Sequence, residues 1–209
     1  MRPQAQHAQA RAVARLQRDV VRTAVAIYRK RYPGIDIRLV EHGSERLWEA
    51  LLSGEIELAA SLLPVSEGFE WKAIQREPLT VLLPAGHTLS RRRSVDLLAL
   101  RELPFILFES GFALNRIILD GCHRHGFEPT VVARSSQIDF IVALAATGMG
   151  AAFLPRTIAE QRKHPSVARV PLAQADMDWH VAMIWRRGAY LSHAAKAWLD
   201  LVATTRGKK

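Results

Sequence analysis

The sequence predicts an α/β fold, and three observations support this prediction. With 209 residues, 49% of them apolar, the chain can bury a full hydrophobic core, either as one large domain or as two smaller lobes. Short apolar runs typical of buried strands alternate with amphipathic runs of helical period, in the order of parallel crossover units. Glycine follows several of the predicted helices directly, where helices commonly end in a left-handed residue.

Two helices and three strands are predicted in the first 85 residues. Apolar side chains recur at helical spacing over residues 20–28, and basic residues at 29–31 follow in the last turn, where they suit the helix dipole. Ser44 can cap a second helix, and Gly54 can end it. Alternating or continuous apolar residues predict strands over three segments: 35–41, 55–61 and 78–84.

The rest of the chain repeats this alternation. Ser94 is predicted to cap a short helix, and Ser192 to cap the last one. Further helices are predicted over residues 114–125 and 137–147, with Gly126 at the end of the first. Strands are predicted over 104–110, 130–135, 151–155, 167–172 and 179–185. The inner face of the last helix is predicted to consist of Ala195, Trp198, Leu199 and Val202.

Gly148 and Gly150 stand between a predicted helix and a predicted strand. We expect Gly148 to take the positive-φ position after the helix, and Gly150 to let the backbone pass close to its neighbours. Two glycines in "GMG" fall far short of the G-x-G-x-x-G dinucleotide fingerprint. Both are first of all structural, although their loop lies where ligand crevices form in open parallel sheets.

Several classes of protein are excluded by the composition and motifs. The single cysteine, Cys122, can form neither an internal disulfide nor a cysteine-based metal cage, which fits a reducing compartment. The sequence contains no G-x-S-x-G and no G-x-x-x-x-G-K-[ST] motif. His123 and His125 lie about 200° apart around a predicted helix, so they cannot share one metal ion. We expect no catalytic residue, no cofactor and no metal.

The charge favours anionic partners. The formal net charge is +9, which suits nucleic acid, an acidic ligand or an acidic protein surface. The basic clusters at 29–31, 91–93 and 186–187 are short and lack the interleaved aromatic residues of a single-strand binding groove. Neither a secretory signal nor a membrane span is predicted, so we expect a cytoplasmic protein without membrane contact.

Five blocks of the sequence, taken in order, resemble the effector-binding domain of LysR-type transcriptional regulators. They are "YRKRYPGIDIRLVEHGSERLWEALLSGEIELAAS", "PLTVLLPAGHTLS", "VDLLALRELPFILFES", "ATGMGAAFLP" and "YLSHAAKAWLDLV". The resemblance implies a type 2 periplasmic-binding-protein-like fold, in which two Rossmann-like lobes are joined by two crossover strands. Lobe I would comprise residues 1–85 and 179–209, and lobe II residues 86–178. The polar segment 85–93 fits the first crossover.

The sequence departs from the family pattern at two points. The stretch "QHAQARAVA" stands where the family has an apolar strand, and its small or polar residues have poor strand propensity. We therefore expect lobe I to lack its first strand or to carry a poor substitute. No helix-turn-helix is present in the sequence, so the chain should not bind an operator by itself.

The resemblance implies that a small effector binds in the cleft between the lobes, at loops that follow strands. Backbone N–H groups and a hydroxyl at a helix N-terminus can hold a carboxylate there. The candidate residues are Gly43, Ser44, Leu62 and Pro64 in lobe I, and Ser110, Gly111, Phe112, Ser135, Ser136 and Gln137 in lobe II. Ser44 and Ser136 can equally be plain N-caps, and Phe112 can be a core residue. Arg134 can pair with an anion or lie on the surface.

The sequence thus predicts a ligand sensor that works by population shift. An effector that touches both lobes would favour their closed arrangement and change the conformation of a DNA-bound homodimer or tetramer. DNA would be contacted only through a helix-turn-helix domain that this chain does not contain. Three alternatives remain: a solute receptor of a transport system, an enzyme on the same scaffold, and a non-specific DNA-binding protein.

Overall fold

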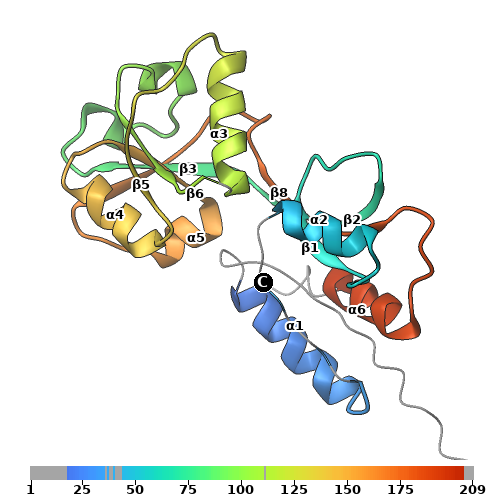
Figure 1. Ribbon diagram of the computed structural model, residues 1–209. Coiled ribbons are helices and arrows are strands. Elements are labelled where there is room, and N and C mark those ends of the chain that lie inside the picture. Colours follow the sequence, from blue (N-terminus) through green and yellow to red (C-terminus); the bar gives the residue numbers. More distant parts are fainter. Residues whose placement is uncertain (1–17, 36, 38–39, 41–43, 111, 205–209) are drawn as a thin grey trace, which may run out of the picture. The chain divides into compact units, whose positions relative to one another are not determined.

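The computed structural model describes residues 18–35, 37, 40, 44–110 and 112–204, which form an α/β protein of two compact units (Figure 1). This confirms the predicted fold class. Unit 1 comprises Met1–Gln75 and His180–Lys209, and unit 2 comprises Arg76–Trp179. The first chain crossing therefore lies ten residues before the boundary expected at residue 85, because the strand over 79–84 is hydrogen-bonded within the sheet of unit 2.

Unit 1 contains a three-stranded sheet covered by a helix. The strand order is β1 (Ala59–Leu62), β8 (Trp179–Arg186), β2 (Phe69–Glu77), and β1 pairs with β8 in antiparallel register. Helix α2 (Ser44–Leu52) packs its apolar face on this sheet. The buried cluster between them consists of Leu47, Ala50, Leu51, Ile56, Ala59, Phe69, Ala182 and Ile184.

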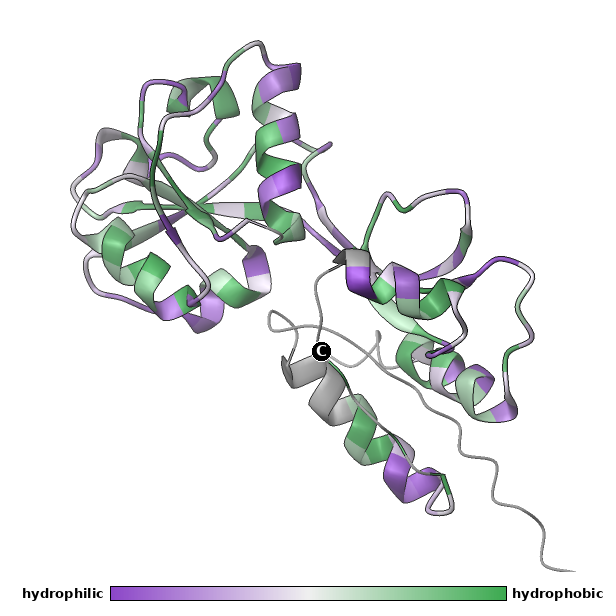
Figure 2. Ribbon diagram, in the orientation of Figure 1, coloured by the Kyte–Doolittle hydropathy of each residue, from purple (hydrophilic) through white to green (hydrophobic). Residues whose placement is uncertain are grey.

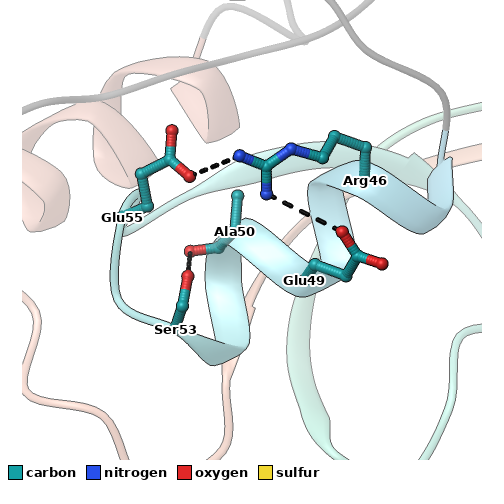
Figure 3. Close-up of polar contacts among 5 residues, drawn as sticks. All are labelled: Arg46, Glu49, Ala50, Ser53 and Glu55. Atoms are coloured by element: carbon teal, nitrogen blue, oxygen red, sulfur yellow. Dashed lines mark hydrogen bonds and ion pairs between the residues drawn. The ribbon is translucent and has the colours of Figure 1, made fainter.

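Polar contacts on the outer side of α2 hold the turn that follows it. The Arg46 guanidinium lies 2.7 Å from a Glu55 carboxylate oxygen and 3.8 Å from Glu49 (Figure 3). The Ser53 hydroxyl donates to the Ala50 carbonyl at 3.2 Å (Figure 3). Between these contacts Gly54 takes φ 76°, which confirms the predicted left-handed end of the helix.

The other two helices of unit 1 pack against each other. In α1 (Arg18–Arg31), the Tyr28 hydroxyl donates to the Ala194 carbonyl of α6 (His193–Thr204) at 2.8 Å, and the Tyr28 ring lies edge-on to Trp198. Burial raises the pKa of Tyr28 to about 12. The predicted cap of α6 is confirmed, because the Ser192 hydroxyl accepts the Ala195 N–H at 3.1 Å. All four residues predicted for its inner face are buried.

Unit 2 contains a five-stranded mixed sheet. Its strands, in spatial order, are β5 (Val131–Ser135), β4 (Phe105–Phe108), β6 (Ala151–Pro155), β3 (Leu79–Pro84) and β7 (Val167–Pro171). Strands β5, β4 and β6 are parallel, as predicted for crossover units. Strand β3 runs antiparallel to both of its neighbours, so the sheet is mixed rather than purely parallel.

Helices cover both faces of this sheet. The chain moves from β4 outward to β5 through α3 (Ala113–Arg124) and returns to β6 through α4 (Ile138–Ala146), so right-handed crossovers place these helices on opposite faces (Figure 1). Helix α5 (Arg156–Gln161) follows β6 on the side of α4. Helix α3 carries a hydrophobic side and a hydrophilic side, as an amphipathic cover requires (Figure 2).

The glycines between α4 and β6 have the predicted roles. Gly148 has φ 83° directly after the helix. A Cβ atom on Gly150 would lie 2.5 Å from the Pro104 carbonyl oxygen, closer than any side chain tolerates. Gly126 ends α3 with φ 78°, again as predicted. These positions therefore require glycine for backbone reasons.

Other expectations were wrong or lie outside the described residues. Asp96, not Ser94, caps the short 3₁₀ helix Leu97–Leu100, since its carboxylate accepts the Leu98 N–H at 2.8 Å. Strand β2 and helix α5 were not predicted. The region proposed to replace the family's first strand falls in residues 1–17, and the predicted strand 35–41 is described only in part. In the described part of the chain, no helix is long and apolar enough to span a bilayer.

Candidate functional site

The loops after β4 and β5 meet at one edge of the unit 2 sheet. The strands are parallel, with Phe108 opposite Ser135, so their carboxyl ends lie side by side. The Glu109 N–H donates to the Ser135 carbonyl at 3.2 Å, which extends the pairing into both loops. The structure thus brings the Ser110 and Ser135 segments together. They lie at the carboxyl ends of parallel strands, where ligands commonly bind in open α/β sheets.

Asn115 holds the loop after β4 in place. This residue lies in the first turn of α3 and its side chain is buried. Its amide oxygen accepts the Phe108 N–H at 3.0 Å, and its amide nitrogen donates to the carbonyls of Phe108 and Glu109, both at 2.9 Å. Three of its hydrogen bonds therefore fix where β4 ends and α3 begins. The sequence prediction did not include this residue.

The predicted residues of the β4 loop occupy different environments. Ser110 is exposed, and Gly111 lies outside the described residues. Phe112 is half-buried, and its ring stacks on the buried Phe108 ring with centroids 5.0 Å apart and an interplanar angle of 20°. Phe112 is therefore partly a packing residue, with one portion of its surface left for another contact.

The segment after β5 forms a tight turn into α4. The Ser135 side chain is buried, and its hydroxyl accepts the Gln137 N–H at 3.0 Å, so it shapes the turn. Ser136 is half-buried and is not the N-cap; Gln137 is, with φ −107° and no side-chain capping bond. The N-cap interpretation of Ser136 is thus wrong. Ser136 directly precedes this N-cap, and a helix N-terminus without a capping side chain suits an anion.

Arg134 supplies a positive charge at the same edge. Its guanidinium donates to the Phe108 carbonyl at 3.2 Å, which places the cation at the carboxyl end of β4. Arg134 is nevertheless exposed to solvent. An arginine fork can bind a carboxylate in two-point fashion. The edge of unit 2 therefore combines serine hydroxyls, a helix N-terminus and one cation.

The candidates of unit 1 surround the end of β1. Leu62 is buried and belongs to the core, whereas Pro64, joined to Leu63 by a cis peptide bond, is exposed. Ser44 is the first residue of α2 rather than a residue preceding the helix. The position of its side chain and all of Gly43 lie outside the described part of the chain, so its predicted capping role stays a prediction. Within unit 1 the structure thus assigns Leu62 to packing and leaves Pro64 accessible.

The sequence matches one family along nearly the whole chain. The family model described as the LysR substrate binding domain matches residues 12–206. An uncharacterized HTH-type transcriptional regulator, YwbI of Bacillus subtilis, is 33% identical over 174 residues, covering 83% of this chain and 58% of the relative. The transcriptional dual regulator GltC of the same organism is 27% identical over 190 residues, covering 90% and 63%.

A solved structure supports the same fold. The effector binding domain of BenM with its effector benzoate superimposes with a TM-score of 0.82 at 21% identity, covering 94% of this chain and 91% of the other. The present chain spans less than two thirds of the length of both curated relatives. The similarity therefore concerns one domain of those longer proteins.

Proposed function

Since the chain belongs to the family of LysR substrate-binding domains, we propose that it senses a small anionic effector and thereby controls a transcriptional regulator. The relatives are transcriptional regulators, which favours a sensor over a transport receptor or an enzyme. We propose that it acts in the cytoplasm as part of a homodimer or tetramer. DNA would be contacted by a helix-turn-helix domain outside this chain.

One observation carries the proposed site. In unit 2 the Arg134 guanidinium, the residue Ser136 and the N-terminus of α4 lie at the carboxyl ends of two paired strands. Each of these groups favours an anion, and together they should bind an anion more strongly than a single solvated arginine on the surface does. The proposed effector is therefore a small molecule with a carboxylate, bound by the segments 110–112 and 135–137.

Unit 1 would supply the second set of contacts. The candidates are Gly43 and Ser44 at the start of α2 and the exposed Pro64 after β1. An effector that binds residues of both units favours one arrangement of the units by its differential affinity. That difference is the signal that a DNA-bound oligomer would read. A ligand that binds unit 2 alone would not favour one arrangement of the units over another, so it would give no signal.

A thermal-shift screen of small carboxylates, followed by titration calorimetry of the best binder, tests this function. We expect Ser136→Ala and Ser44→Ala each to weaken binding by about 10-fold or more, because a hydrogen bond to a charged group contributes about 1.5–3 kcal/mol. The matched controls are Ser166→Ala in unit 2 and Ser66→Ala in unit 1, both exposed serines in turns. Unchanged affinity in both site variants would exclude this assignment.

A further inference from the structure

Residues 85–95 run along one edge of the unit 2 sheet. Strand β7 is the outermost strand on this side, and its inner neighbour is β3. The Ala85 N–H donates to the Ser166 carbonyl just before β7, and the Val95 N–H donates to the Pro171 carbonyl at its end, both at 2.9 Å. The segment between these two anchors therefore lies alongside β7 from one end of the strand to the other.

Five exposed cations form a basic edge on this side of unit 2. They are Arg91, Arg92 and Arg93 beside β7, Arg169 within β7 and Lys163 just before it. Neither of the segments that carry them, 85–95 and 163–173, contains an aspartate or a glutamate. Neighbouring like charges repel one another, so an anionic partner would relieve this repulsion.

The cations of the basic edge have no carboxylate partner among the described residues. Elsewhere in unit 2, Arg124 and Arg162 pair with carboxylates at 2.7 and 2.8 Å. Asp96 follows the segment beside β7, but its two carboxylate oxygens accept the Leu98 N–H at 2.8 Å and the Gln174 side-chain amide at 2.9 Å. The positive charge of the basic edge is therefore not neutralised within the described part of the unit.

The chemistry of the basic edge fits the backbone of duplex DNA. The large hydrophobic side chains that are exposed on the described chain all lie outside its two segments. The core of a protein interface is rich in aromatic residues, and single-stranded nucleic acid stacks its bases on aromatic rings. The phosphates of a duplex require neither, since lysine and arginine bind them by charge and hydrogen bonds. A strand of five residues is about 17 Å long, and a duplex carries about ten phosphate charges over that length.

We propose that the basic edge binds the phosphate backbone of duplex DNA without sequence preference. This contact goes beyond the proposed function and adds to the operator contact of a helix-turn-helix domain. It is separate from the candidate effector residues of unit 2, which follow β4 and β5 on the other side of the sheet. About four of the five cations reach a phosphate, and each contact releases counterions from the DNA.

The salt dependence of DNA binding tests this inference. Fluorescence anisotropy of a short labelled duplex of arbitrary sequence would give the association constant of the intact chain at several salt concentrations. With four phosphates contacted, the slope of log K against log salt should be about −3.6. The triple variant Arg91→Gln, Arg92→Gln, Arg93→Gln should retain a slope of about −0.9, and Arg169→Gln alone one of about −2.7. Replacing the same three arginines by lysine should keep the parent slope.

A matched control removes the same charge from unit 1. Arg29, Lys30 and Arg31 form an exposed basic triplet in the last turn of α1, and replacing all three by glutamine should leave the slope near the parent value. Circular dichroism checks that each variant is folded. Equal slopes for the parent and the triple variant, or an equal loss in the control, overturn the inference. Binding of single-stranded DNA or poly-glutamate at least as tight as that of the duplex also overturns it. All these outcomes leave the proposed effector function untouched.

Discussion

Single buried polar groups decide how the loops of unit 2 are held. Asn115 satisfies three backbone groups at the end of β4. At the start of α5 the buried carboxylate of Glu77 accepts the N–H and the hydroxyl of Thr157. In both cases a side chain supplies a hydrogen bond to a backbone group that has no partner within its own strand or helix. The candidate site therefore depends on residues that need not touch a ligand.

The variant Asn115→Asp tests this role. It removes two N–H donors and turns a carboxylate oxygen toward the carbonyls of Phe108 and Glu109. We expect the free energy of unfolding to fall by about 3 kcal/mol, because unsatisfied acceptors and a buried charge both cost energy. Asn115→Ala, which loses the bonds without the charge, should cost about 2 kcal/mol. Urea denaturation measures both, and an Asp variant as stable as the parent would contradict this role.

Cys122 gives a prediction about pH. Its side chain is fully buried in α3, and burial raises the pKa of the thiol from 9.0 to about 11. Above pH 9 the unfolded chain loses this proton and the folded chain keeps it, so the folded state is destabilised as pH rises from 9 towards 11. Relative to Cys122→Ala, the parent should lose stability across this window and not below it. Denaturation curves of both proteins with the same pH dependence would contradict this.

The same residues illustrate what can be predicted at this scale. The roles of Gly148 and Gly150 were predicted because a left-handed helix end and a close backbone approach both require glycine, which is visible in the sequence. Asn115 was not, since an asparagine in the first turn of a helix is common and its partners depend on where the preceding loop returns. Asp96 was missed for a similar reason. Ser94 is an equally good cap by type, and only the position of the first helical turn distinguishes them.

At the scale of elements, strands buried on both faces were predicted well and the exposed strand was missed. All four side chains of β4 and all five of β6 are buried, so each reads as a continuous apolar run. Strand β2 lies at an edge of its sheet and mixes buried with exposed positions irregularly, so neither a continuous run nor a strict alternation marks it.

The close approach of β6 to the segment before β4 is testable. Gly150→Ala would place a methyl group 2.5 Å from the Pro104 carbonyl oxygen, and we expect a loss of about 1–3 kcal/mol in unfolding free energy from overpacking. Gly86→Ala is the matched control, since a Cβ there meets no atom within 4 Å. It should change stability by less than about 0.5 kcal/mol. Equal stability of the two variants would exclude the close contact.

At the scale of the whole molecule, the two units differ in how the chain builds them. Unit 2 is one continuous stretch with its own five-stranded sheet, whereas unit 1 is assembled from both ends of the chain. The resemblance to a known family predicted the bilobal organisation, which periodicity alone left open. The position of the first chain crossing was not predictable from patterns, because β3 reads as a buried strand in either sheet.

Unit 2 should therefore fold by itself. A fragment of residues 76–179 retains every strand of its sheet and helices α3, α4 and α5. We expect a circular dichroism spectrum of an α/β protein and a single cooperative thermal transition. A fragment without secondary structure would mean that unit 2 depends on unit 1 for its stability.

The central claim is that the effector is bound by residues of both units. Titration calorimetry of one carboxylate against the intact chain and against the fragment 76–179 tests it most directly. Loss of two or three charge-assisted contacts from unit 1 should weaken binding to the fragment about 100-fold or more. If a folded fragment binds the same carboxylate as tightly as the intact chain, the effector does not bridge the units, and the claim is contradicted.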